Sequence, residues 1–189
     1  MYKGIDLTFV NLKTLEGREG LIIQADIKYN GKKIATYRDD GNGGCVDINA
    51  IGSLKKDAQG NYQKTQQLID NRALLEQLNA EFKTLPKVKA YSSEFEDCIE
   101  FAMDDFISNK EILKNAKKGL VVQTQPNSPE YSIIQWKAGS VTSMLKKYGK
   151  AQVVPLLEKA ITKEQKKGNA ILAQDYYISI GVNPEIFTK

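Results

Sequence analysis

The stretch LIIQADIKYNGKKIATYR, residues 21–38, decides the fold of the amino-terminal part of the chain. From Leu21 to Tyr29 apolar and polar side chains alternate, which is the pattern of a strand with one buried face. Asn30-Gly31 follows, a dipeptide that tolerates positive φ at both central positions of a type I′ turn, and residues 32–38 form the returning strand. We therefore expect a β-hairpin. A loop of this kind sets the expected cross-strand pairs: Tyr29 with Lys32, Ile27 with Ile34, and Ala25 with Thr36.

Two further strands flank this hairpin. Residues 5–9 alternate in the same way before it, and residues 46–51 do so after it. The sequence DDGNGGC at residues 39–45 predicts a chain reversal, and its glycines could also cradle a phosphate through backbone N–H groups. It is not a Walker motif, because no helix and no GK[ST] follow it. Residues 1–54 therefore predict an antiparallel meander of about four strands, and residues 55–61 predict a polar loop.

Two long helices are expected to cover the apolar face of this meander, within residues 62–118. Leucine and phenylalanine recur at helical spacing from Leu68 to Leu85, and Pro86 ends that run. Ser93 and Glu96 form a capping-box pattern at the start of the second helix. Acidic residues come early in the second helix and lysines come late, which complements the helix dipole.

The carboxy-terminal part predicts a second hairpin at residues 119–137 and helices at residues 140–189, the first of them capped by Ser140. Two more helices are expected: one that begins near Val153, with Pro155 acceptable only in its first turn, and one from Ala170 to Ile180. The whole pattern predicts an α+β fold, organised as a single domain over residues 1–189.

The composition excludes several classes of function. The chain has no histidine, which disfavours Ser-His-Asp and Cys-His catalysis, HEXXH metalloproteases and histidine-ligated zinc. Its two cysteines, Cys45 and Cys98, are far apart in the sequence, which favours a reducing cytosol. No run of about 18 apolar residues occurs, so no membrane span is expected. We expect a cytoplasmic protein that is not an enzyme and uses no cofactor or metal.

Three features resemble a family of small uncharacterised proteins of bacteriophages and mobile elements. They are the strand–DGNGG–strand hairpin around Asp40 to Gly44, an acid-rich and then lysine-rich helix like Phe95 to Lys118, and the helix end Lys147-Tyr148-Gly149. The resemblance covers roughly Ile5 to Ile161. It implies a viral accessory context in the cytosol of a host cell, without an established activity.

Two acidic groups are candidate binding residues. The first lies in the glycine-rich turn and consists of Asp39, Asp40 and Asn42. The second lies on the second long helix and consists of Glu96, Asp97, Glu100 and Asp104. The i, i+4 spacing within the helix could hold Mg²⁺, imitate a nucleic-acid backbone, or form the solvated face of an amphipathic helix. These interpretations stay open, and no metal site is assigned.

A basic group lies further along the chain. From Lys110 to Gly168 twelve lysines stand against four acidic residues. The candidate binding residues in this part are Lys117, Lys118, Trp136, Lys146 and Lys147. Lysines near an aromatic ring could bind phosphates beside a stacked base, although lysine without arginine is also typical of a surface that serves solubility.

Two functions follow as expectations. The resemblance implies an accessory protein that binds and inhibits a host factor, most concretely a defence nuclease or its nucleic-acid complex, as anti-CRISPR or anti-restriction proteins do. The alternative is a nucleic-acid or nucleotide-binding protein that uses the lysine-rich carboxy-terminal half. A homodimer is compatible with either function.

Overall fold

The computed structural model describes residues 5–84, 95–125 and 130–188, and for residues 95–98 it describes the backbone alone. The chain divides into two compact units, Met1–Phe106 and Ile107–Lys189, and the boundary falls inside helix α2 (Phe95–Ala116). The α+β class predicted from the sequence is confirmed. That the chain forms one cooperative domain stays a prediction, so each unit is described by itself.

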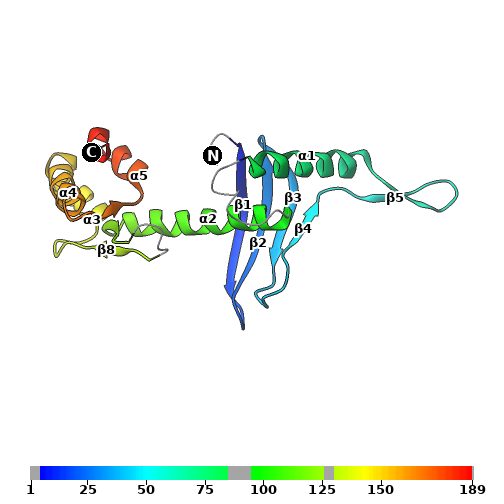
Figure 1. Ribbon diagram of the computed structural model, residues 1–189, viewed down its shortest axis with the longest axis horizontal. Helices are drawn as coiled ribbons and strands as arrows, with labels where there is room; N and C mark the ends of the chain where they lie inside the picture. Colours follow the sequence, from blue (N-terminus) through cyan, green and yellow to red (C-terminus); the bar gives the residue numbers. More distant parts are fainter. Residues whose placement is uncertain (1–4, 85–94, 126–129, 189) are drawn as a thin grey trace. The chain divides into compact units, whose positions relative to one another are not determined.

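The first unit contains the predicted antiparallel meander (Figure 1). Its strands are β1 (Leu7–Glu16), β2 (Leu21–Tyr29), β3 (Lys32–Asp39) and β4 (Asp47–Ala50), and they pair in chain order. The predicted turn is confirmed, since Asn30 and Gly31 both have positive φ, 49° and 73°. One face of the sheet is apolar and buried, and the other carries polar side chains.

The predicted register of the central hairpin is wrong beyond the turn. Tyr29 pairs with Lys32 as expected, but Ile27 pairs with Ala35 instead of Ile34. The register shifts between Ile27 and Lys28, so Ile34 is an additional residue in β3. Ile34 and Ala35 are both fully buried, and the shift places Tyr37, 1% exposed, in the core. Burial of this large ring explains why the bulged register is preferred over the regular one.

Helix α1 (Gln66–Lys83) and the amino-terminal half of α2 cover the apolar face, as predicted. The buried side chains of α1 include Leu68, Leu75, Leu78 and Phe82. The Tyr29 hydroxyl of β2 donates a 2.6 Å hydrogen bond to Glu81 of α1. At β1, the rings of Phe9 and Phe106 have their centres 5.3 Å apart, and this contact joins β1 to α2. The expected helix end at Leu85-Pro86 and the capping box from Ser93 lie outside the described residues.

The predicted polar loop at residues 55–61 is confirmed for residues 57–61, whereas Lys55 and Lys56 belong to a strand. Residues in this region form a second hairpin, with strands β5 (Leu54–Lys56) and β6 (Tyr62–Lys64). The reason is local, because Asp57 folds the loop between the strands by accepting hydrogen bonds from the backbone N–H groups of Gln59 and Asn61, at 2.9 and 2.8 Å.

The second unit is built on a small antiparallel sheet in the order β8-β7-β9. The predicted hairpin is confirmed as β7 (Leu120–Gln123) and β8 (Ser132–Ile134). The third strand, β9 (Ala170–Ile171), pairs with β7 and was expected to be the start of a helix. That helix, α5, spans only Gln174–Ser179. The expectation for Ala170–Ile180 is therefore wrong in its first turn, where the backbone hydrogen bonds go to the sheet instead.

Helices α3 (Val141–Tyr148) and α4 (Lys150–Gln165), with the 3₁₀ turn η2 (Pro184–Phe187), complete this unit. Ser140 caps α3 as predicted, because its hydroxyl accepts a 3.1 Å hydrogen bond from the Ser143 N–H. Helix α4 begins at Lys150, three residues before the expected start, so Pro155 lies beyond the first turn. The expectation that Pro155 needs a first-turn position is thus wrong.

Tyr177 of α5 joins the layers of the second unit. Its side chain is fully buried, and its hydroxyl donates to the Gly119 carbonyl and accepts from the Val121 N–H, both at 2.9 Å. Gly119 has no room for a side chain, since a Cβ atom there would lie 2.4 Å from the Ile134 carbonyl oxygen. The tyrosine therefore satisfies two backbone groups of the segment that directly follows Lys118.

Candidate nucleic-acid interface

Charge is divided unequally between the two units. Residues 107–189 contain thirteen lysines and no arginine against six acidic residues, a net charge of +7. The total of +4 leaves residues 1–106 with a net charge of −3. The second unit therefore attracts anions, whereas the first unit as a whole does not.

Two of the predicted basic-group residues meet in one pocket of about 200 Å³. Its lining is Lys118, Gln135, Trp136, Gly139 and Ser140. The tight turn from Trp136 to Gly139 is closed by a 3.0 Å hydrogen bond from the Gly139 N–H to the Trp136 carbonyl. Gly139 has a φ of 120°, and a Cβ atom there would lie 2.6 Å from the Ser143 hydroxyl. Glycine is therefore required for this turn, which lies next to Trp136 in the lining of the pocket.

The Lys118 ammonium group is held in place by a short chain of hydrogen bonds. It donates to the Asn115 side-chain oxygen at 3.1 Å, and the Asn115 amide donates to the Tyr131 hydroxyl at 2.9 Å. At the start of α3, the N–H groups of Val141 and Thr142 donate to the carbonyls of Lys118 and Lys117. These helix N–H groups are already used, so the positive group offered by the pocket is the lysine side chain.

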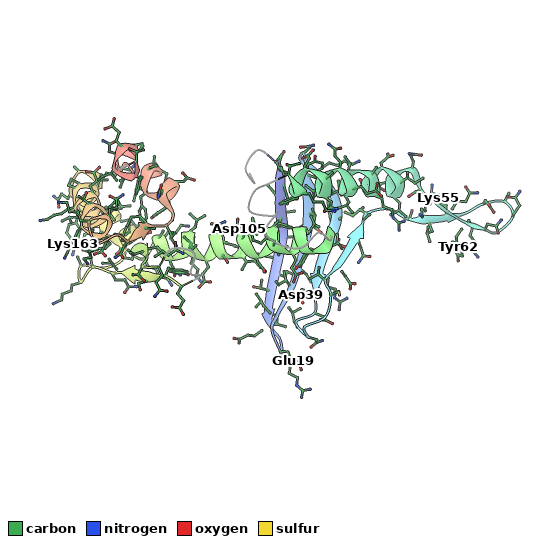
Figure 2. All side chains as sticks on the ribbon, viewed as in Figure 1. Glu19, Asp39, Lys55, Tyr62, Asp105 and Lys163 are labelled. Carbon is green, nitrogen blue, oxygen red and sulfur yellow. The ribbon has the colours of Figure 1, made fainter. Side chains whose placement is uncertain are left out.

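A larger lysine cluster lies on α4, which the sequence interpretation did not select. A groove of about 650 Å³ is lined by Pro155, Glu158, Lys159, Thr162, Lys163, Lys166 and Lys167. Lys159 and Lys163 are spaced i, i+4 within α4, which puts these two lysines on one helix face, and Lys166 and Lys167 follow in the turn after the helix end. Like charges at this spacing destabilise a helix, so the spacing itself is a signal that sequence reasoning could have used. Figure 2 shows Lys163 pointing outward from α4.

The lysines of the groove differ in what they contact. Lys167 forms a 2.6 Å ion pair with Glu164, whose side chain is 8% exposed. This pair, together with Asn169, lowers the pKa of Glu164 below its ordinary value. The one acid in the lining of the groove, Glu158, accepts a 3.0 Å hydrogen bond from the Asn183 N–H. Lys159, Lys163 and Lys166 are exposed and can reach an anion.

The remaining predicted basic residues are exposed but lie in neither of these two linings. Lys146 and Lys147 lie in the last turn of α3, and the Lys147 ammonium lies 5.1 Å from the centre of the Tyr148 ring. Lys117 is exposed next to Lys118. The structure thus brings Lys118 and Trp136 together and leaves the other three as separate surface charges.

The glycine-rich turn is a structural turn whose acids serve its own backbone. Asp39 accepts a 2.8 Å hydrogen bond from the Gly41 N–H, and Asp40 accepts one of 3.1 Å from the Asn42 N–H. Gly41 is buried with a φ of 69°, and a Cβ atom there would lie 3.0 Å from the Gly20 carbonyl oxygen. Asn42 is exposed at the tip of this turn.

The two predicted acidic groups approach each other at Asp39 and Asp104. Burial raises the pKa of Asp104, and the negative charge of Asp39 raises it further. Burial also raises the pKa of Tyr37, with a further contribution from Glu100. The side chains of Glu96 and Asp97 lie outside the described residues. Among the residues that the structure describes, no three His, Cys, Asp or Glu side chains are grouped so that they could hold a metal ion.

Comparison with known protein families, with curated proteins and with solved structures gives no match for this chain. The comparisons therefore supply no relative whose activity could be transferred to this chain, and the resemblance to phage proteins stays a prediction. In the described part of the chain, no helix combines the length and the apolar character that a membrane crossing requires.

Proposed function

We propose that the protein binds nucleic acid through the lysine-rich surface of its second unit. The observation that carries this proposal is the excess of +7 in residues 107–189, together with the lysine groove on α4 that contains exposed Lys159, Lys163 and Lys166. Lys159 and Lys163 repel each other on one face of α4, with Lys166 close by at the helix end, and phosphate groups would relieve this repulsion.

The chemistry of the surface favours contacts with the backbone of the nucleic acid. Lysine acts as a point charge toward phosphate and lacks the planar fork with which arginine reads guanine. The second unit contains no arginine. Trp136 beside Lys118 adds a ring on which a base can stack, a contact that accepts any base. We therefore expect binding with weak sequence preference.

A binding measurement on three proteins tests this function. The test variant carries Lys159→Gln, Lys163→Gln and Lys166→Gln, and it keeps Lys167 because that lysine pairs with Glu164. The control variant carries Lys13→Gln, Lys32→Gln and Lys83→Gln, which are exposed lysines of the first unit. Both variants lose the same net charge, so a general charge effect would weaken both equally.

Trp136 is the single tryptophan of the chain and reports binding from within the second unit. Titration with a single-stranded oligonucleotide at low salt should change its fluorescence in the wild type and in the control variant at similar concentrations. The test variant should need roughly ten times more oligonucleotide or more, since each lost phosphate contact weakens binding. Absence of binding by the wild type, or equal loss in both variants, would contradict the proposal. The host-factor function expected from the family resemblance stays a prediction, since it rests on that resemblance alone.

A further inference from the structure

The β5–β6 hairpin of the first unit lies on the surface without a core of its own. All six of its strand residues are exposed, and the hairpin extends beyond the end of α1 in Figure 1. A two-stranded hairpin is at best marginally stable in water when neither face is covered. Packing against the rest of the unit therefore does not explain why this hairpin has a defined conformation.

The shape is kept by the loop and by the base of the hairpin. Besides its two backbone partners in the loop, the Asp57 carboxylate accepts a 3.0 Å hydrogen bond from the Gln63 side chain. At the base, the Thr65 N–H donates to the Ser53 carbonyl at 2.9 Å, and the Ser53 N–H donates to the Thr65 hydroxyl at 3.2 Å. The hairpin is therefore formed before any partner arrives, which lowers the entropy cost of binding.

One face of the hairpin combines apolar surface with positive charge. The register pairs Leu54 with Lys64 and Lys56 with Tyr62, so these four side chains share one face. Tyr62 is 67% exposed and Leu54 is 54% exposed. The Lys56 ammonium lies 5.1 Å from the centre of the Tyr62 ring. We call this set of four residues the Tyr62 face.

The other face carries Lys55, which pairs with Gln63. Figure 2 shows Lys55 and Tyr62 on opposite sides of the hairpin. Between Asp47 and Asp70 the one acidic residue is Asp57, and its carboxylate is used within the loop. The hairpin is thus locally basic although the unit that carries it has a negative net charge.

We propose that this hairpin is a second nucleic-acid contact, and that its Tyr62 face enters the major groove of a duplex. The proposal rests on the function proposed above for the class of ligand, and it adds a separate site and a preference for duplex over single strand. Two strands lie about 4.8 Å apart, and a two-stranded ribbon fits a major groove about 12 Å wide.

In that position the lysines and the apolar side chains have different partners. Lys56 and Lys64 lie close to the phosphates, while Tyr62 and Leu54 contact bases and sugars on the groove floor. A protein partner fits less well, because a stable protein interface needs about 800 Å² on each side. Two exposed apolar residues on a ribbon of three residue pairs supply only part of such an area.

Variants of the two hairpin faces test the proposal with a duplex of about 20 base pairs, long enough to span nearly two helical turns. Tyr62→Ala and Lys64→Gln should each weaken duplex binding severalfold, because the first loses contacts with base edges and the second loses a phosphate contact. Tyr62→Phe keeps the ring and should bind like the wild type. Lys55→Gln removes the same charge as Lys64→Gln from the opposite face and should have little effect.

The same proteins titrated with the single strand separate the two proposals. We expect the hairpin variants to bind the single strand like the wild type, with the same Trp136 fluorescence change. Hairpin variants that bind the duplex unchanged would overturn this inference and leave the function of the second unit intact, and so would a wild type that binds only the single strand. A change of sedimentation mass in Tyr62→Ala with unchanged duplex affinity would identify the hairpin as a self-association contact and would also overturn it.

Discussion

Single polar side chains with more than one hydrogen-bond partner stabilise each unit, and Tyr177 is the clearest case. Burial raises the pKa of Tyr177 to about 12. The hydrogen bond that its oxygen accepts from the Val121 N–H acts in the opposite direction and lowers the pKa. Its ring lies in the core of the second unit. Its hydroxyl donates a hydrogen bond to the Gly119 carbonyl and accepts one from the Val121 N–H. Loss of that hydroxyl would leave both backbone groups buried without a partner.

We predict that Tyr177→Phe lowers the free energy of unfolding by about 1–3 kcal/mol, the cost of unsatisfied buried polar groups. Chemical denaturation monitored by Trp136 fluorescence measures this change, because Trp136 packs against the same core. Tyr176→Phe is the matched control, since Tyr176 is only partly buried, and it should change stability by less than about 0.5 kcal/mol. Equal stability of the two variants would contradict the role assigned to Tyr177.

The raised pKa of Tyr177 also sets a pH dependence. The folded state holds the neutral phenol more strongly than the unfolded state, whose tyrosine titrates near 10.0. The stabilisation is therefore fully present below pH 10 and is lost as the pH rises toward 12. In Tyr177→Phe this alkaline loss should be smaller, which a comparison of unfolding curves at pH 8 and at about pH 11 would show.

In the first unit, Asp26 lies on the polar face of the four-stranded sheet, where it also contacts two partners. It forms a 2.9 Å ion pair with Lys33 and accepts a 2.6 Å hydrogen bond from Asn11, whose backbone has a φ of 55° at the bulge of β1. These two contacts, with Lys33 the larger, hold the pKa of Asp26 below 3.8. Asp26 thus fixes the bulge and neutralises one lysine of β3.

Asp26→Asn should destabilise the protein by about 1 kcal/mol at pH 7, as expected for a charge-assisted hydrogen bond. Because the pKa is lowered by folding, the stabilisation is present above pH 3.8 and is lost as the pH falls through the folded-state value. The difference in unfolding free energy between wild type and variant should therefore shrink toward pH 2.5 or so. A difference that stays constant with pH would show that charge is not its cause.

Among the elements, the β5–β6 hairpin depends most on one residue. The backbone N–H of Asn61 and the other donors of the loop lower the pKa of Asp57. We predict that Asp57→Ala disorders the hairpin and leaves the sheet and helices folded, because the hairpin contributes no buried side chains. Hydrogen exchange should show faster exchange confined to residues 54–64. Gln63→Ala removes one of the side-chain contacts and should have a smaller effect, whereas slow exchange in Asp57→Ala would contradict the prediction.

The strands and helices show which features of the fold can be predicted from the sequence and which cannot. Alternation and the Asn30-Gly31 turn predict the meander, since both depend on residues near in sequence. The bulge at Ile34 depends on which side chain fills the core, and strand β9 depends on pairing with β7. Ala173 shows the limit most clearly: its φ of 54° is not helical, so α5 begins only after it, and alanine adopts this conformation only under tertiary constraint.

The basic character of the candidate site could be predicted from the sequence, but only some of its residues could. The count of lysines predicts a basic half, and Trp136 and Lys118, which share one pocket, were both among the residues expected. The α4 groove was not predicted, because no aromatic residue accompanies its lysines in the sequence, and only their i, i+4 spacing marks them. In the glycine-rich turn, Asp39 and Asp40 accept hydrogen bonds from their own backbone, a role that composition cannot separate from ligand contact.

For the whole molecule, the unequal division of charge is the property on which the proposed function depends. Binding that arises from phosphate contacts weakens as salt rises, because each contact releases a condensed counterion. Lys159, Lys163 and Lys166 of the groove are exposed, so their replacement should change binding with little effect on the stability of the fold. The number of contacts can therefore be counted from the salt dependence of affinity.

The most direct test is the slope of log affinity against log salt concentration for a single-stranded oligonucleotide. With about five to seven lysines in contact, the wild type should give a slope of roughly −4 to −5. The variant with Lys159, Lys163 and Lys166 changed to glutamine should give a slope smaller by about 2, while the variant with Lys13, Lys32 and Lys83 changed should keep the wild-type slope. A wild-type slope near zero, or equal slopes for the two variants, would contradict the proposal that the second unit binds nucleic acid.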